Sequence, residues 1–378
     1  MSEKYILSPE FRSLALDVAS QSMVLLKNDK DILPLPIEGR RIALVGPLAS
    51  NRADLLGTWA ITGQAAEVET VLDGFQHYIE KESLTYVQGC SVSGDDHLDI
   101  PAVIAAAQES DVVVLVVGES SGMSGEAHSR VHLGLPGRQQ ELVNALMAVG
   151  KPLITVLMCG RPLVIPSLVD ESAAFLVGWH GGIRAGKAVA DILFGKVNPS
   201  GKLTSSWPRA EGQIPVYYSH KSTGRPAEGT GTTQFHEPFR STYLDEPNVP
   251  LFSFGEGKSY SSFEYKNLQV HTPVVKMDGK LVVTATVNNI SNRPGVEIIQ
   301  FYVRDLVGSV TRPVKELKGF QRISLEAGQK CEVRFEVPVD ALGFHGLDNQ
   351  YRVEPGDYQI WVGPDSTSGL EGMITVIL

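Results

Sequence analysis

Residues 111–117 read Asp-Val-Val-Val-Leu-Val-Val, and this run decides the fold of the first half of the chain. A run of β-branched residues without polar alternation is typical of a strand that is buried on both faces of a parallel sheet. The loop that follows, 118–130, reads Gly-Glu-Ser-Ser-Gly-Met-Ser-Gly-Glu-Ala-His-Ser-Arg. Because ligands of open α/β sheets bind at the carboxyl ends of such strands, we expect the functional site on this loop.

Strand and helix patterns alternate on both sides of this run. Short apolar runs predict further strands, and apolar residues at helical spacing predict the helices between them. The expected strands are 42–46, 111–117, 153–158 and 173–178, and the expected helices are 9–26, 100–109, 137–149 and 183–195. This order is typical of βαβ units, so the first half is predicted to be α/β with a mostly parallel sheet.

The last part of the chain shows strand patterns alone. Gly- and Pro-containing turns separate its apolar and alternating runs, which lie at 281–289, 298–303, 332–337 and 358–362. About 110 residues of this kind are typical of a β-sandwich. The predicted division is therefore a connecting helix and linker at 1–38, an α/β sandwich at 39–208, an extended wrapping linker at 209–262 and an all-β sandwich at 263–378.

Composition narrows the classes of partner. With 33 basic against 43 acidic residues the formal net charge is −10, and no Lys/Arg run exceeds two residues. Nucleic-acid binding needs clustered positive charge and is excluded. Cys90, Cys159 and Cys331 lie far apart and imply neither a disulfide framework nor a zinc site. No segment approaches the ~20 apolar residues of a membrane span, and the first residues lack an apolar signal core. We expect no membrane partner, metal or cofactor.

A serine hydrolase is one hypothesis for the loop. Residues 118–122, Gly-Glu-Ser-Ser-Gly, match the G-x-S-x-G pattern, with Ser120 as nucleophile and His180 or His220 as base. A nucleophile elbow runs directly from strand into helix, whereas 123–136 is rich in Gly and Ser and has no helical period. The serine esterase hypothesis therefore has half of its structural context.

The two carboxylates of the loop allow a different chemistry. A Glu that is lifted into a cleft and partly desolvated has a raised pKa, which suits a general acid. Retaining hydrolysis of a glycoside needs two carboxyl groups about 5–5.5 Å apart, one as nucleophile and one as acid/base. Glu126 is a candidate for one of them. The alternative is that Glu119 and Glu126 cap a helix or pair with Arg130 or Arg138.

Motifs in a fixed order extend this hypothesis over nearly the whole chain. They include Gly-Glu-Ala-His-Ser-Arg at 125–130 and Arg-Pro-Val-Lys-Glu-Leu-Lys-Gly-Phe at 312–320. The others lie at 22–28, 44–49, 57–59, 117–119, 150–153, 160–163, 190–195, 198–203, 213–218 and 223–226. With these motifs the chain resembles the C-terminal part of glycoside hydrolase family 3, in particular the periplasmic β-glucosidase subgroup.

The resemblance implies an α/β sandwich followed by a fibronectin type III-like domain, in agreement with the periodicity. It also implies that the Glu of the Gly-Glu-Ala-x-Ser-Arg motif, here Glu126, is the catalytic acid/base. Ser129 and Arg130 match the motif beside it and are expected to bind substrate, although Arg130 alternatively braces the loop. Glu119 is expected to support the loop by accepting backbone N–H bonds.

One segment departs from the family pattern. Residues 179–186 read Trp-His-Gly-Gly-Ile-Arg-Ala-Gly, and relatives often carry Glu and Gly in place of Arg184 and Ala185. A contact at this helix entry is therefore expected to differ. His180 in the same segment is expected either to contact substrate at the rim of the site or to pack inside the domain.

The resemblance also implies a partner. Family members begin with a (β/α)₈ barrel that carries the nucleophilic Asp, and this chain starts where that barrel would end. The expected function is the acid/base-bearing part of a retaining, exo-acting β-glucosidase, inactive or nearly so without the barrel. The expected partners are the barrel, in cis or as a separate subunit, and a β-glucoside or short β-gluco-oligosaccharide. A carbohydrate-binding or scaffolding fragment with an inert Glu126 is the alternative. The family implies a periplasmic location, and a natively split enzyme would be cytoplasmic.

Overall fold

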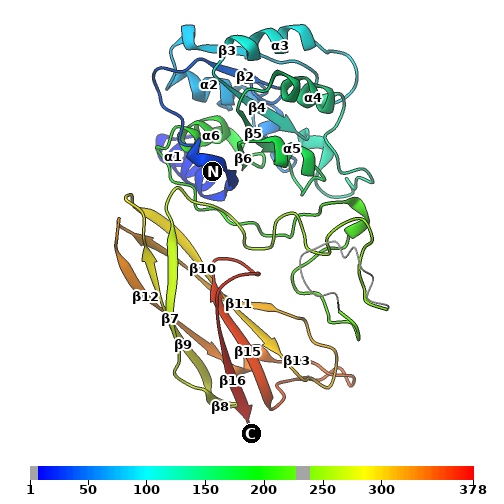
Figure 1. Cartoon of the computed structure of the whole chain (residues 1–378), viewed down its shortest axis with the longest axis vertical. Coiled ribbons are helices and arrows are strands. Elements are labelled where there is room, and N and C mark those ends of the chain that lie inside the picture. The colour runs from blue at the N-terminus through cyan, green and yellow to red at the C-terminus, as the bar shows by residue number, and fades with distance from the viewer. Residues whose placement is uncertain (1–6, 227–238) are drawn as a thin grey trace. The chain divides into compact units, whose positions relative to one another are not determined.

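The chain divides into two units, Met1–Lys202 and Leu203–Leu378. The computed structural model describes residues 7–226 and 239–378 (Figure 1). The region 1–38, expected to be a connecting helix and linker, belongs to the first unit and contributes a strand to its sheet. The segment 209–262 belongs to the second unit. Among its described residues the only helical turn is a 3₁₀ turn at Glu211–Gln213.

A six-stranded sheet lies at the centre of the first unit. Its order is β1-β6-β5-β4-β2-β3. The strands are β1 (Val24–Asn28), β2 (Ile42–Val45), β3 (Leu84–Val87), β4 (Val112–Gly118), β5 (Leu153–Met158) and β6 (Ala174–Val177). Neighbours from β6 to β3 are parallel, and β1 is antiparallel to β6. Every residue of β4 is buried, as its uninterrupted apolar run predicts. The predicted mostly parallel α/β sheet is confirmed.

Helices flank this sheet. They are α1 (Pro9–Ser22), α2 (Val71–Gln76), α3 (Ile100–Glu109), α4 (Gln139–Val149), α5 (Pro166–Glu171) and α6 (Ala185–Leu193). Helix α1 starts as its sequence predicts, because the Ser8 hydroxyl accepts the N–H of Phe11 and Pro9 occupies the first turn. It ends at Ser22, so the helix expected over 9–26 is wrong at its C-terminal end. None of the described helices has the length and apolar content to cross a bilayer.

The strand order reverses beside β4. The chain runs from β2 outward to β3 and then returns to β4 on the other side of β2. Right-handed crossovers place the connecting helices of the two directions on opposite faces. Accordingly α2 packs with α6, and α3 packs with α4 (Figure 1). The carboxyl ends of β2 and β4 therefore form a topological switch point, where open α/β sheets bind ligands.

The second unit is a β-sandwich. One sheet has the order β11-β10-β15-β16-β8, the other the order β12-β9-β7, and β13 and β14 form a short pair. The strands are β7 (Phe263–Val270), β8 (Val274–Lys276), β9 (Lys280–Asn289), β10 (Gly295–Asp305), β11 (Glu316–Leu325), β12 (Lys330–Pro338), β13 (Phe344–His345), β14 (Tyr351–Arg352), β15 (Gly356–Gly363) and β16 (Leu370–Ile377). The four predicted strands lie in β9, β10, β12 and β15, which confirms the all-β sandwich.

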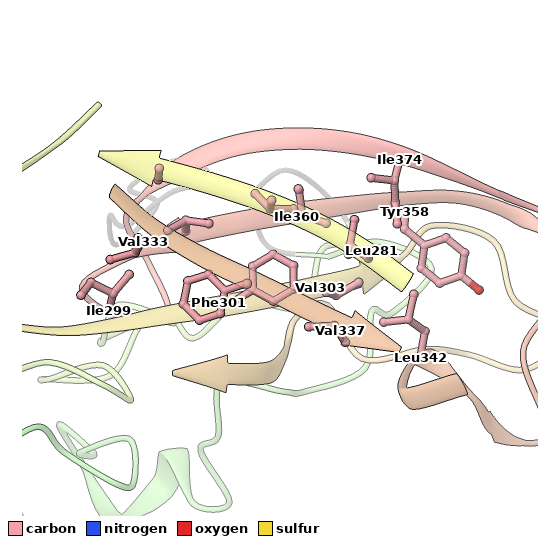
Figure 2. Packing of buried hydrophobic residues seen from close by; sticks show 14 of the residues in the cluster. Leu281, Ile299, Phe301, Val303, Val333, Val337, Leu342, Tyr358, Ile360 and Ile374 are labelled. Carbon is pink, nitrogen blue, oxygen red and sulfur yellow. The ribbon is translucent and has the colours of Figure 1, made fainter. Parts of the chain in front are cut away.

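Apolar side chains from both sheets of this unit meet in one core (Figure 2). Phe301 of β10 and Phe335 of β12 stack with their ring centroids 5.2 Å apart. Val283 of β9 and Ile360 of β15 belong to the same cluster and are completely buried. Alternate residues of each strand point inward, because the side-chain period of a strand is two residues.

Candidate active site

Four loops meet at the carboxyl edge of the sheet in the first unit. They follow β2, β4, β5 and β6. Hydrogen bonds, ion pairs and close packing join residues from all four. The joined residues are Asp54 and Thr58 after β2, residues 119–130 after β4, Gly160 and Arg161 after β5, and His180 after β6. The loop that the sequence predicts to be functional is therefore surrounded by three others.

Glu119, the residue that follows β4, is completely buried. A buried carboxylate is stable only when cations and hydrogen bonds compensate its charge. Its Oε1 lies 2.8 Å from Nη1 of Arg130 and 3.1 Å from Nε of Arg161. Its Oε2 accepts the backbone N–H of Gly160 at 3.2 Å. Glu119 therefore ties the loop after β4 to the loop after β5, mainly through cations and with one backbone N–H bond.

The two arginines extend this network to the backbone of the loop. Arg130 donates from Nη2 to the carbonyl of Gly134 at 3.0 Å. Arg161 donates from Nη2 to the carbonyl of Met123 and, at 2.7 Å, to that of His128. The contacts of Arg130 correspond to the bracing role among the two roles expected for it. Arg161 stands in a family motif, but nothing in its sequence context signals these contacts.

The start of the loop is held from the loop after β2. Oδ1 of Asp54 accepts the backbone N–H of Ser121 at 2.8 Å and its hydroxyl at 3.1 Å. The Thr58 hydroxyl contacts the carbonyl of Ser121 and, at 2.5 Å, that of Ser124. Gly125 has a φ of +113°, and a Cβ there would lie 2.5 Å from Cγ2 of Thr58. The backbone just before Glu126 thus packs directly on Thr58.

Glu126 lies at the exposed tip of the loop. No hydrogen bond or ion pair with a described residue engages its side chain. Ala127 has a φ of +61°, in the left-handed region, and the N–H of His128 donates to the carbonyl of Gly125 at 3.2 Å. The backbone therefore reverses at Glu126. Ser129 is exposed as well, and the first unit does not supply the desolvation that we expect for a general acid.

His180 lies beside Gly57 and Gly160. A Cβ at Gly160 would stand 3.5 Å from its Nε2, and a Cβ at Gly57 would stand 3.2 Å from its Cβ. Both ring nitrogens are buried. Burial lowers the pKa of this imidazole, while the Glu119 carboxylate and the backbone of Asp54 oppose the shift. These surroundings correspond to packing inside the unit, the second of the two roles expected for His180.

The helix entry that departs from the family pattern has an ion pair of its own. Nη1 of Arg184 lies 2.6 Å from Oε2 of Glu69, whose Oε1 is 2.6 Å from Nε2 of His77. The backbone carbonyl of Glu69 accepts the N–H of Gly186 in the first turn of α6 at 3.1 Å. Arg184 thus joins the start of α6 to the residue that precedes the cap of α2.

The loop lacks the geometry of a serine nucleophile elbow. After β4 the chain forms a 3₁₀ turn at Ser121–Met123, and the next α-helix, α4, begins only at Gln139. An elbow places its nucleophile between a strand and an immediately following helix. His220, one of the proposed bases, belongs to the second unit, where its Nδ1 lies 3.3 Å from the Lys221 carbonyl. The loop that carries Ser120 therefore does not have the strand–turn–helix arrangement that a nucleophilic serine of this class needs.

Comparison with known proteins assigns both units. Residues 23–260 match the family model of the glycosyl hydrolase family 3 C-terminal domain, and residues 297–366 match that of a fibronectin type III-like domain. A periplasmic beta-glucosidase of Salmonella typhimurium is 40% identical over 97% of this chain and 50% of its own length. A beta-xylosidase of Formosa agariphila is 39% identical over 94% of this chain and 49% of its own.

A solved structure has the same architecture. The beta-glucosidase from Listeria innocua in complex with isofagomine superposes with a TM-score of 0.93 at 39% identity. The superposition covers 99% of this chain and 51% of that one. The chain therefore spans about half the length of the relatives that it matches.

Proposed function

The chain belongs to glycosyl hydrolase family 3, and we propose that it is the acid/base-bearing part of a retaining, exo-acting β-glucosidase. The observation that carries the proposal is the setting of Glu126. Its carboxylate is exposed and unpaired among the described residues, on a backbone held by Thr58 and Arg161 from two neighbouring loops. Such a group is free to exchange a proton with a bound ligand while the backbone that carries it is held in place.

In the proposed reaction Glu126 acts twice. Its carboxyl proton first passes to the glycosidic oxygen as the bond from that oxygen to the anomeric carbon breaks. A second carboxylate attacks the anomeric carbon and forms a glycosyl-enzyme ester. Glu126, now ionised, then removes a proton from the water that displaces this carboxylate and releases the sugar with retained configuration. The second carboxylate must lie about 5–5.5 Å from the first.

A (β/α)₈ barrel is the proposed source of that second carboxylate, as an Asp. The relatives are about twice as long as this chain, which leaves room for such a domain. A row of exposed apolar side chains on α1 supports a docking partner. Phe11, Leu14 and Val18 are 49%, 56% and 59% exposed, and their spacing places them on one face of the helix. Exposed apolar rows of this kind mark interaction sites.

The proposed substrate is a β-glucoside or a short β-gluco-oligosaccharide, from which the enzyme removes terminal β-D-glucosyl residues. The names of the Salmonella and Listeria relatives support glucose as the sugar. The name of the Salmonella relative also supports a periplasmic location. The exo mode of action is proposed from the family resemblance.

The proposal is tested by joining this chain to the half of the Salmonella beta-glucosidase that it does not match. We expect the chimera to hydrolyse an aryl-β-glucoside, and the chain alone to be inactive or nearly so. Glu126→Ala in the chimera should lower kcat for a poorly activated glucoside by about 10²–10⁴-fold, the range typical of a lost general acid/base. Azide, which needs no base to attack the intermediate, should restore turnover of an activated aryl glucoside.

A matched variant separates this effect from general damage. Glu109, at the exposed C-terminal end of α3, is also a surface carboxylate in the first unit, and Glu109→Ala should leave the rate unchanged. An active chimera whose rate survives Glu126→Ala would instead identify the chain as a carbohydrate-binding or scaffolding part.

A further inference from the structure

We propose that Asp54 and Thr58 are positioning residues that set the place of Glu126, an inference that rests on the proposed acid/base role of that residue. Neither side chain is expected to touch the substrate. Both act on the loop from outside it, because they belong to the loop after β2 whereas Glu126 belongs to the loop after β4. The two loops meet at the switch point of the sheet.

Asp54 is itself held in place before it holds the loop. Its Oδ2 accepts the side-chain N–H of Asn51 at 2.8 Å, and its backbone N–H donates to Oδ1 of Asn51 at 2.9 Å. Its free oxygen, Oδ1, receives both donors of Ser121, the N–H and the hydroxyl. Hydrogen bonds to an ionised acceptor are stronger than neutral ones. Asp54 thus fixes the entry of the loop through a carboxylate that cannot easily turn away.

Thr58 acts closer to Glu126. Its hydroxyl contacts the carbonyl of Ser124, and its methyl group lies where the backbone of Gly125 passes. Only Gly, which lacks a Cβ, allows that approach at a φ of +113°. The residue after this contact is Glu126.

Residues 124–128 form a short arch that carries Glu126, and two contacts inside the arch hold its shape. The contacts between the arch and other loops therefore decide where Glu126 lies. Within the arch, the N–H of His128 donates to the Gly125 carbonyl at 3.2 Å, and Nδ1 of His128 lies 3.2 Å from the Ser124 carbonyl. At its far end Arg161 holds the carbonyl of His128. Loss of the Asp54 and Thr58 contacts would leave the arch intact and held by Arg161 alone, through the carbonyls of Met123 and His128. Glu126 would then swing as part of a rigid body.

Such a displacement weakens proton transfer more than it weakens binding. A general acid must lie within hydrogen-bond reach of the oxygen that it protonates, and a misplacement of about 1 Å can cost about 10²-fold in rate. When the leaving group departs without protonation, the rate of bond cleavage does not depend on the position of the general acid. The signature of a positioning residue is therefore a rate defect that depends on the leaving group, which general instability would not produce.

The experiment uses the chimera described above with two substrates. Asp54→Ala and Thr58→Val should each lower kcat/KM for an alkyl β-glucoside by about 10–100-fold. They should change kcat/KM for 2,4-dinitrophenyl β-glucoside by less than about threefold, since that group leaves without an acid. Azide should raise kcat of both variants on the activated substrate. Thr58→Val removes the hydroxyl but keeps the branched shape of the side chain, so we expect it to fold normally. It therefore still tests the proposal if Asp54→Ala fails to fold.

Asp111→Ala is the matched control. The Asp111 carboxylate also accepts a backbone N–H, that of Arg41 at 2.8 Å, but it stands at the opposite, amino end of β4. The loss in kcat/KM of Asp111→Ala, if any, should be the same for both substrates. Equal losses on both substrates in the Asp54 and Thr58 variants would overturn the positioning role and leave a structural one.

A second measurement needs no catalysis. In the 378-residue chain alone, amide hydrogen exchange of residues 121–128 should quicken by about tenfold or more in Asp54→Ala and stay unchanged in Asp111→Ala. Unchanged exchange in Asp54→Ala would overturn the proposal by itself. If Glu126→Ala lacked the leaving-group signature while exchange rose in Asp54→Ala, the acid/base assignment would fail and the anchoring of the loop would stand.

Discussion

Two glutamates of one loop have opposite surroundings. Glu119 is completely buried between the guanidinium groups of Arg130 and Arg161, whose side chains are 19% and 20% exposed. Glu126, seven residues later, is exposed and unpaired among the described residues. Glu119 is therefore committed to holding loops together, whereas Glu126 is available for chemistry. The same residue type has a structural role in one place and a proposed catalytic role in the other.

Removal of the charge at Glu119 should destabilise the first unit strongly. Glu119→Gln would leave two arginines partly buried without their counter-ion, which typically costs about 3–5 kcal/mol. Urea unfolding followed by circular dichroism would measure the loss. Glu141 forms an ion pair with Arg138 on the surface, so Glu141→Gln should change stability by less than about 1 kcal/mol. Equal effects of the two variants would show that the Glu119 network contributes little.

At the residue scale the sequence predicted part of the site. Glu119 and Glu126 are candidates because their loop follows a strand that is recognisable from its own residues, and the role expected for Glu126 comes from the family resemblance. The contacts of Asp54 and Thr58 are not predicted, because they join loops that are distant in the chain. Thr58 lies in the family motif at 57–59, but the motif does not tell what its side chain contacts. The burial of His180 likewise depends on two other loops, so its sequence neighbours left both of its roles open.

At the scale of single elements, long apolar runs predicted strands well. The runs around β2, β4, β5 and β6 gave nearly the correct bounds because these strands are buried on both faces. The errors fall where the signal is weak or shared. Val24 to Leu26 continue the apolar pattern of α1, so the sequence predicts these first three residues of β1 as helix. The sequence does not predict β3, α2 or α5. β3 is half-buried at the sheet edge, and the two helices are too short to show a helical period.

The junction of β4 with its loop should be sensitive to a single methyl group. Gly118 has a φ of +139°, and a Cβ there would overlap the carbonyl oxygen of Met158 on β5. We expect Gly118→Ala to cost about 3 kcal/mol or more, because the added atom strains both strands.

Gly122 provides the comparison for this substitution. It lies in the same loop, and a Cβ there would meet nothing within 4 Å. Gly122→Ala should therefore change the free energy of unfolding by less than about 1 kcal/mol. Urea unfolding of the two variants side by side measures the difference, and similar midpoints would contradict the close strand contact at Gly118.

At the scale of the whole molecule, each unit has a core of its own. The first buries the strands of its α/β sheet, and the second buries the facing sides of two β-sheets (Figure 2). Both belong to the pattern of a known family, yet the chain covers about half of its relatives. The apolar row on α1 is the surface on which we propose that the barrel docks.

The docking role of α1 can be tested with separate polypeptides. Leu14→Asp should raise the dissociation constant between this chain and the unmatched half of the Salmonella relative by about tenfold or more, because a charge would be buried in the interface. The variant should fold normally, since Leu14 is 56% exposed. Ser13→Asp, an exposed position beside the row, is the control. Unchanged binding of Leu14→Asp, measured by calorimetry, would contradict the docking role.

The isolation of Glu126 has an evolutionary consequence. Because no described residue bonds to its side chain, we expect replacement of Glu126 to leave the free energy of unfolding nearly unchanged. A descendant that lost this carboxylate would fold, persist in the cell and keep its surfaces, so selection for stability alone would not remove it. Loss of the proposed acid/base is therefore open through one substitution, whereas loss of the charge at Glu119 carries the stability cost predicted above.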